Sequence, residues 1–163
     1  MRKVVGVIVA LLVATSAAKA LDVQRLELVE YGIYTADEQS CHRDAEGIKR
    51  CSRGNVRHAV TSWTVPAQIG VEFGLRYRIV GTPKGAKVSV KRDWRLPEPG
   101  FRSPSADTPI LRLDRVDETK IGDTVYVSYA FDDPWELVPG PWTIEFWYGD
   151  RKLDERQFMV SKP

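Results

Sequence analysis

Large apolar side chains occupy every second position of the segment 142–148, near the end of the sequence. A period of two residues, in a segment rich in aromatic and β-branched side chains, is typical of a β-strand with one buried face. A helix would place apolar side chains every three or four residues instead. The segment is therefore predicted to be a strand that buries Trp142, Ile144, Phe146 and Tyr148 and exposes Thr143, Glu145 and Trp147 to solvent.

The segment that follows is predicted to pair with this strand in a hairpin. Gly149 and Asp150 supply turn residues, and Phe158 and Val160 resume the apolar face on the return strand. Leu153 has the opposite parity to Phe158, because an odd number of positions separates them. We therefore expect either a β-bulge between these two residues or Leu153 at the turn.

Similar alternation marks further short segments, which are separated by turn residues or prolines. The clearest of them is 71–80, where apolar side chains again occupy every second position. No segment has the 3.6-residue period of an amphipathic helix. About seven to eight short strands without a helix predict an all-β fold, specifically a single immunoglobulin-like antiparallel β-sandwich. The expected strands are 22–34, 57–65, 71–80, 86–91, 110–116, 124–131, 142–148 and 154–160.

Two longer segments are predicted to be loops. Residues 35–55 are polar and charged and show no period. Residues 94–107 contain three prolines, and proline cannot donate a ladder hydrogen bond in a central strand.

The first 20 residues have the composition of a cleaved signal peptide. A basic start precedes an unbroken apolar run at 4–13, and Ala18, Lys19 and Ala20 form a small-residue cleavage site. The apolar run is too short to span a bilayer comfortably and no second one follows, so we expect no transmembrane segment after cleavage. Residues 21–163 are expected to form a single β-sandwich domain that is periplasmic or secreted.

Removal of residues 1–20 takes away three of the 24 basic residues and none of the 22 acidic ones. The remaining chain therefore carries 21 basic and 22 acidic residues and is close to neutral. A protein that binds nucleic acid through a general basic surface carries a clear basic excess. We therefore expect no nucleic-acid partner.

The two cysteines of the chain, Cys41 and Cys51, both lie in the polar segment 35–55. An even cysteine count in an exported protein favours a disulfide between them. The alternative is a metal site, because thiolate, imidazole and carboxylate ligands suit zinc or copper, although the spacing matches no known metal motif. We expect the disulfide, and neither a metal nor another cofactor. The further ligands of the alternative site would be His42, Asp44, Glu46 and His58.

Three parts of the sequence carry a resemblance to a known family. They are the segment 31–34, the segment 65–74, and the segment 140–145 followed by Gly149 and Asp150. This pattern resembles that of a bacterial family of small exported β-rich proteins that is classed only as a domain of unknown function. The resemblance covers most of the chain after residue 20 and implies a compact β-rich domain. It implies no activity and offers no functional residues to transfer.

The candidate ligand-binding residues lie in predicted loops. Aromatic side chains there could line a cleft for a sugar or a peptide, or they could cap the open end of the sandwich. Neighbouring carboxylates could perform acid–base chemistry, or they could be solvated residues of a turn that begins at Asp133 and Pro134. The candidates are Trp94, Phe101 and Trp135 among the aromatic residues and Asp132, Asp133 and Glu136 among the acidic ones.

Residues 84–102 carry six basic side chains against two acidic ones. Such a patch could hold an anionic envelope polymer or a phospholipid surface. Outward lysines on an edge strand also prevent pairing with another sheet, and we favour this second explanation. The basic residues are Lys84, Lys87, Lys91, Arg92, Arg95 and Arg102.

The inventory of catalytic groups is small. The chain has two histidines and none of the motifs G-x-S-x-G, H-E-x-x-H or G-x-G-x-x-G. We therefore interpret the chain as a non-catalytic exported binding module, or envelope-associated interaction module, whose partner is a protein or polymer of the cell envelope. The alternative is a carboxylate-based hydrolase that acts on glycans or other envelope polymers.

The cleavage site predicts the mature N-terminus. Protein isolated from the cell envelope should begin at Leu21, because Ala18 and Ala20 place small residues where signal peptidase requires them. Mass spectrometry of the intact protein checks this prediction. A chain that still carries Met1 in that fraction would contradict it.

Overall fold

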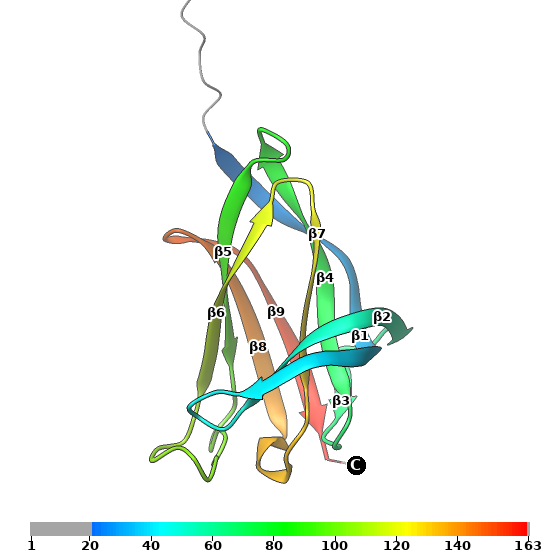
Figure 1. The fold of residues 1–163 in the computed structure, drawn as a ribbon, viewed down its shortest axis with the longest axis vertical. Helices are drawn as coiled ribbons and strands as arrows, with labels where there is room; N and C mark the ends of the chain where they lie inside the picture. Colours follow the sequence, from blue (N-terminus) through cyan, green and yellow to red (C-terminus); the bar gives the residue numbers. More distant parts are fainter. Residues whose placement is uncertain (1–20, 163) are drawn as a thin grey trace, which may run out of the picture.

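The computed structural model describes residues 21–162; the predicted signal peptide at 1–20 and residue 163 lie outside the described part of the chain. The described residues form nine strands and one short 3-10 helix. The strands make two sheets that pack face to face (Figure 1). The all-β sandwich that the alternating segments predict is confirmed. Between residues 21 and 162, no helix is long and apolar enough to cross a membrane.

The two sheets, here called sheet A and sheet B, are antiparallel except for one pair of strands in sheet B, β3 and β9. Sheet A has the order β2 (Lys49–Val60), β1 (Asp22–Arg43), β4 (Glu72–Thr82) and β7 (Thr124–Ala130). Sheet B has the order β3 (Thr64–Pro66), β9 (Arg151–Ser161), β8 (Gly140–Tyr148), β5 (Lys87–Arg95) and β6 (Arg112–Lys120). The 3-10 helix η1 (Pro134–Glu136) connects β7 to β8.

The core between the sheets is centred on Phe73 of β4, which is fully buried. Its ring lies 5.5 Å from that of Trp142 and 5.1 Å from that of Phe158, measured between centroids, and both pairs are edge-to-face. Such pairs contribute about 0.5–1.5 kcal/mol each beyond the apolar area that they bury. The apolar face of β4 in sheet A thus packs against the closing hairpin of sheet B, which consists of β8 and β9.

The closing hairpin forms as the alternation predicts. Trp142, Ile144 and Phe146 are buried on β8, whereas Tyr148 is half-buried at its end. The pairing of β8 with β9 shifts between Phe146 and Trp147 and leaves Leu153 without a partner. The β-bulge that the parity of Leu153 predicts is therefore present.

The exposure predicted for Glu145 is wrong, because this side chain is fully buried although it lies on the outer face of β8. Lys152 Nζ and Arg95 Nη2 lie 2.7 and 2.9 Å from its carboxylate, and Trp147 Nε1 donates a hydrogen bond of 3.1 Å. These long side chains cover the carboxylate and remain partly exposed themselves. Burial opposes the charge, but these hydrogen bonds and the nearby cations hold the pKa of Glu145 below its usual range.

The loop predicted for 35–55 is also wrong. Beyond Tyr34, β1 leaves β4 and pairs only with β2, so that residues 35–57 form a two-stranded hairpin, here called the arm. The predicted strand at 57–65 is interrupted at 61–63, and Trp94 belongs to β5 instead of a loop. Alternation is missing in the arm because both of its faces carry polar side chains and its pairing relies on backbone hydrogen bonds.

The packing of β8 predicts how two neighbouring substitutions affect stability. Phe146→Ala should cost about 3–5 kcal/mol because it opens a cavity in the core. Glu145→Ala should cost about 1–3 kcal/mol, since Trp147 Nε1 loses its acceptor. Thr143→Ala, on the same outer face, should cost less than about 0.5 kcal/mol. Denaturant unfolding measures all three; a cost for Glu145→Ala as small as that for Thr143→Ala would show that the buried carboxylate does not stabilise the fold.

Candidate functional site

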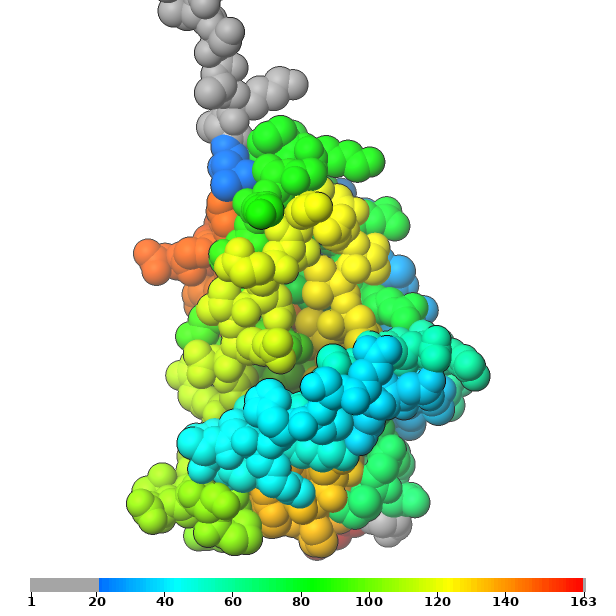
Figure 2. Space-filling view, in the orientation of Figure 1, coloured from blue at the N-terminus to red at the C-terminus, as the bar shows by residue number. Residues whose placement is uncertain are grey.

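The arm lies across one side of the sandwich, where β7 forms the edge of sheet A and β6 the edge of sheet B. In Figure 1 it runs in front of β7 towards β6, and Figure 2 shows its side chains covering this face. An uncovered edge strand exposes a row of unpaired backbone N–H and C=O groups. The arm therefore covers the open side of the sandwich between the edge strands β6 and β7 (Figure 1).

The tip of the arm is anchored by one apolar side chain. Ile48 is only 1% exposed and packs against the core. Asp44 shapes the tip, because its carboxylate accepts hydrogen bonds from the N–H groups of Ile48 and Glu46 at 2.9 and 3.1 Å. Gly47 has a positive φ of 81°, which favours glycine, and a Cβ there would come within 3.0 Å of two serine side chains of the 96–111 segment.

Ion pairs attach the flanks of the arm to the body. Arg43 pairs with Asp133 at 2.6 Å and Lys49 pairs with Asp132 at 3.2 Å. Nearer its base, Arg76 of β4 donates a hydrogen bond of 2.9 Å to the carbonyl of Val56. The arm is thus connected to the body at its tip, along its flank and at its base.

The disulfide expected between Cys41 and Cys51 is confirmed. The two residues lie directly opposite each other in the arm, with 4.1 Å between their Cα atoms. In the alternative metal site, the two cysteines would have to bind the metal as thiolates. The disulfide leaves neither sulfur as a thiolate. Within residues 21–162 the one group with ligand-like spacing is Glu38 with these same two cysteines, and it lacks a free thiolate. The proposed ligands His42, Asp44, Glu46 and His58 do not form such a group in the described part of the chain.

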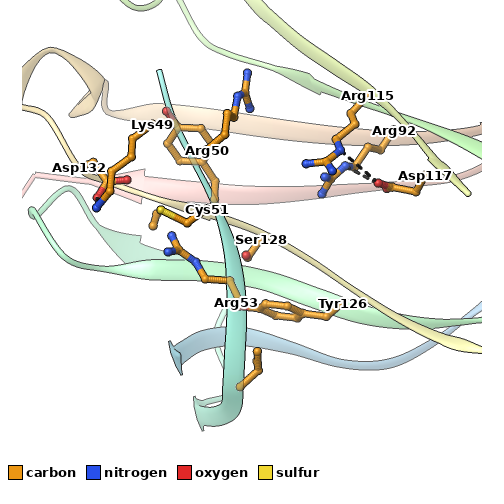
Figure 3. A pocket seen from close by; sticks show the side chains of 13 residues that line it. Lys49, Arg50, Cys51, Arg53, Arg92, Arg115, Asp117, Tyr126, Ser128 and Asp132 are labelled. Carbon is orange, nitrogen blue, oxygen red and sulfur yellow. Dashed lines mark hydrogen bonds and ion pairs between the residues drawn. The ribbon is translucent and has the colours of Figure 1, made fainter. Parts of the chain in front are cut away.

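A cavity of about 380 Å³ lies between the arm and the open side of the sandwich. Figure 3 shows side chains of the arm beside Tyr126 and Ser128 of β7, with Arg92, Arg115 and Asp117 of β5 and β6 grouped farther along. Five basic and two acidic residues contribute to its lining. The basic ones are Lys49, Arg50, Arg53, Arg92 and Arg115.

Arg92 lies at the floor of this cavity. It points inwards from β5 and stands directly opposite Arg115 of β6 in the strand register. Asp117 is shared by both, at 3.1 Å from Arg92 Nε and 3.6 Å from Arg115 Nε. Burial lowers the pKa of the Arg92 guanidinium, Asp117 counteracts this, and the positive charges of Arg115 and Arg50 add to the lowering.

The aromatic candidates gather in the core at one end of the sandwich. Trp94 is 3% exposed and Phe101 is fully buried. Trp135 is half-buried, and its ring lies edge-to-face on Phe101 at 5.6 Å. Phe101 in turn contacts Trp142 of β8 at 5.4 Å. This packing fits the alternative in which the aromatic residues cap the sandwich.

The acidic candidates lie close together around η1. Glu136 accepts hydrogen bonds within this turn, and Asp132 and Asp133 form ion pairs with the arm. Glu136 is 1% exposed, and its carboxylate accepts the N–H groups of Asp132 and Asp133 at 2.6 and 3.1 Å. Burial raises the pKa of Glu136, and these two N–H groups oppose the rise. Asp132 and Asp133 are occupied by their ion pairs with the arm, and of the three only Asp132 lines the cavity.

The basic patch predicted over 84–102 is divided by the sheet. Arg95 pairs with the buried Glu145 and Lys91 lies 3.5 Å from Asp114, both on the outer face of sheet B. Arg92 alone among the six lines the cavity. The sequence gives no signal for its neighbours Arg50 and Arg115, because residues 50, 92 and 115 meet only through the strand register and the path of the arm.

The anchoring of the arm predicts a local effect for a core substitution. Ile48→Ala should cost about 2–5 kcal/mol, because it removes the buried contact of the tip. In this variant hydrogen exchange should be much faster at the amides of residues 49–56 than at those of β8, since the arm can open separately while the sandwich stays folded. Ile69→Ala, at a side chain that is 46% exposed, is the control and should change neither. Equal exchange rates at the protected amides of the arm and of β8 would show that the arm is not a separate unit.

Comparisons with known proteins agree with this architecture. A crystal structure of an immunoglobulin-like protein from Pseudomonas aeruginosa aligns with 90% of this chain and 100% of its own, with a TM-score of 0.59 and 22% identity. At this identity the similarity shows the fold, and it confirms the immunoglobulin-like sandwich. No curated protein matches the sequence. The family profile described as "Domain of unknown function (DUF3859)" matches residues 22–160. The resemblance noted in the sequence is thus confirmed, and the chain belongs to the DUF3859 family.

Proposed function

We propose that this protein is an exported, non-catalytic binding module of the cell envelope that receives its partner at the cavity beneath the arm. The observation that carries the proposal is the cavity itself, which is recessed, lined by polar side chains and enclosed on one side by the arm. Recessed sites of about 300–1,000 Å³ are the usual places for small ligands or protruding groups. The partner is a protein or a polymer of the envelope.

The proposed cellular location, or address, of the protein is the periplasm or the extracellular medium. Residues 1–20 act as the cleaved signal, and residues 21–163 act as one domain. The disulfide in the arm supports this address, because disulfides persist in oxidising compartments and are rare in the cytosol.

The state of the carboxylates favours binding over hydrolysis. A hydrolase of the carboxylate type needs one group that donates a proton to the substrate and one that activates water or attacks. Glu136 is buried and accepts backbone N–H groups, and Asp132 and Asp133 are ion-paired with the arm. These interactions give each carboxylate a structural role.

The proposal is tested by filling the cavity. Val56→Trp should obstruct the cavity from its arm side, and Ala59→Trp places the same side chain at an exposed position of the same strand. Each purified protein, after a check of its melting curve, is mixed with isolated envelope material, and bound protein is measured by sedimentation.

We expect saturable binding by the unaltered protein and Ala59→Trp and loss of binding by Val56→Trp, with no soluble fragments released. Equal binding by both variants would contradict the proposed site. Release of soluble glycan fragments would contradict the non-catalytic function and support the hydrolase alternative.

A further inference from the structure

Two arginines stand directly opposite each other at the floor of the cavity, and this arrangement is unfavourable on its own. Arg92 and Arg115 are cross-strand neighbours in the pairing of β5 with β6. Like charges at directly opposed positions destabilise a sheet. One carboxylate, Asp117, lies between them and compensates only one of the two charges. A third guanidinium, that of Arg50 from the arm, lines the same cavity.

The other two basic side chains of the cavity are already neutralised. Lys49 lies 2.6 Å from Glu38 and 3.2 Å from Asp132. Arg53 lies 3.0 Å from Glu38 and 3.2 Å from Glu72. Each of these two residues has two carboxylate partners, so neither leaves an uncompensated positive charge for a ligand.

The three remaining guanidinium groups have few partners. Arg50 donates through Nε to Asp44 at 2.9 Å. Apart from their ion pairs with Asp117, the side chains of Arg92 and Arg115 form no hydrogen bond to any of residues 21–162. A guanidinium carries five N–H donors, so most donors of this trio are left for groups outside the chain. Arg115 is 62% exposed and can turn to water, whereas Arg92 is 15% exposed and is confined to the cavity.

We infer that the cavity beneath the arm binds an oxyanionic group, a carboxylate or a phosphate, between Arg50, Arg92 and Arg115. The inference rests on the proposed function, because it names the chemistry of the partner at the same site. The planar fork of N–H donors on arginine matches the oxygens of both groups and can bind them through two parallel hydrogen bonds. A bound oxyanion also removes the repulsion between the opposed arginines.

The arm supplies one of the three binding side chains and fixes its position. Arg50 is followed by Cys51, whose disulfide joins both strands of the arm at this point. Its Nε is held by Asp44, which also shapes the tip. A side chain that is fixed before binding loses less conformational entropy when the ligand arrives. The disulfide therefore serves the binding site as well as the arm.

The test measures binding of small anions to the purified protein by calorimetry at low salt. The probes are inorganic phosphate and glucuronate, a sugar carboxylate, with glucose as the uncharged control. The variants are Arg50→Gln and Arg115→Gln, each of which removes one guanidinium of the site. Arg25→Gln is the matched control, because it removes an exposed arginine of β1 whose partner is Glu27.

We expect at least one anion to bind and glucose not to bind. Each site variant should weaken the binding about tenfold or more, since it removes charged hydrogen bonds, while Arg25→Gln should change it less than about twofold. A preference for phosphate would identify a phosphorylated partner, and a preference for glucuronate would identify a carboxylated glycan; both results support the inference.

Two results would overturn the inference. One is that neither anion binds, and the other is that Arg50→Gln and Arg115→Gln bind as tightly as Arg25→Gln. If envelope material still binds in a way that Val56→Trp abolishes, the proposed function stands and only the anionic nature of the ligand is wrong. Equal envelope binding by the two tryptophan variants would instead refute the proposed function.

Discussion

The burial of Ile48 at the tip of the arm is the contact on which the candidate site depends. Burying an isoleucine contributes about 1.5–3 kcal/mol, whereas an ion pair at the surface contributes little because water and salt screen it. The pairs of Arg43 with Asp133 and of Lys49 with Asp132 are ion pairs of this surface type. They therefore orient the arm but contribute little to the stability of its docked position. Without the apolar contact, the arm would be a two-stranded hairpin of marginal stability, and the cavity would lose its outer wall.

The sandwich and the cavity obey different physical rules. In the core of the sandwich, aromatic rings around Phe73 fill the space between the sheets, and the buried Glu145 on the outer face of β8 has its hydrogen-bond partners. At the cavity, the opposed arginines Arg92 and Arg115 contradict the rule for cross-strand pairs. Like charges also oppose each other elsewhere in this ladder, as at Asp93 and Asp114, but those pairs lie on the outer face of sheet B. Arg92 and Arg115 differ because they face the cavity, and a local conflict in a recessed site is typical of functional sites. The residues that stabilise the core are thus different from the arginines that form the candidate site.

Much of the sandwich could be predicted from the sequence, because strands with one face on the core alternate visibly, as in 71–80 and 142–148. The arm could not, because its pairing relies on the backbone and its tip contributes one buried apolar side chain, Ile48. Parity placed Glu145 on the outer face correctly but could not show that neighbouring side chains cover it. The candidate site was missed for a related reason, since Arg92 and Arg115 become neighbours only through the register of β5 with β6.

The most direct test of the fixed arm is a distance distribution in solution between the arm and the body. Spin labels introduced on non-natural residues at Ala45 in the tip and Lys120 at the end of β6 leave the disulfide intact. Both positions are exposed, so the labels themselves should not disturb the packing. A pulsed dipolar measurement should give one narrow distribution, because the buried tip allows a single position of the arm. A broad distribution, or one with two separate maxima, would contradict the claim that the arm forms a fixed wall of the cavity.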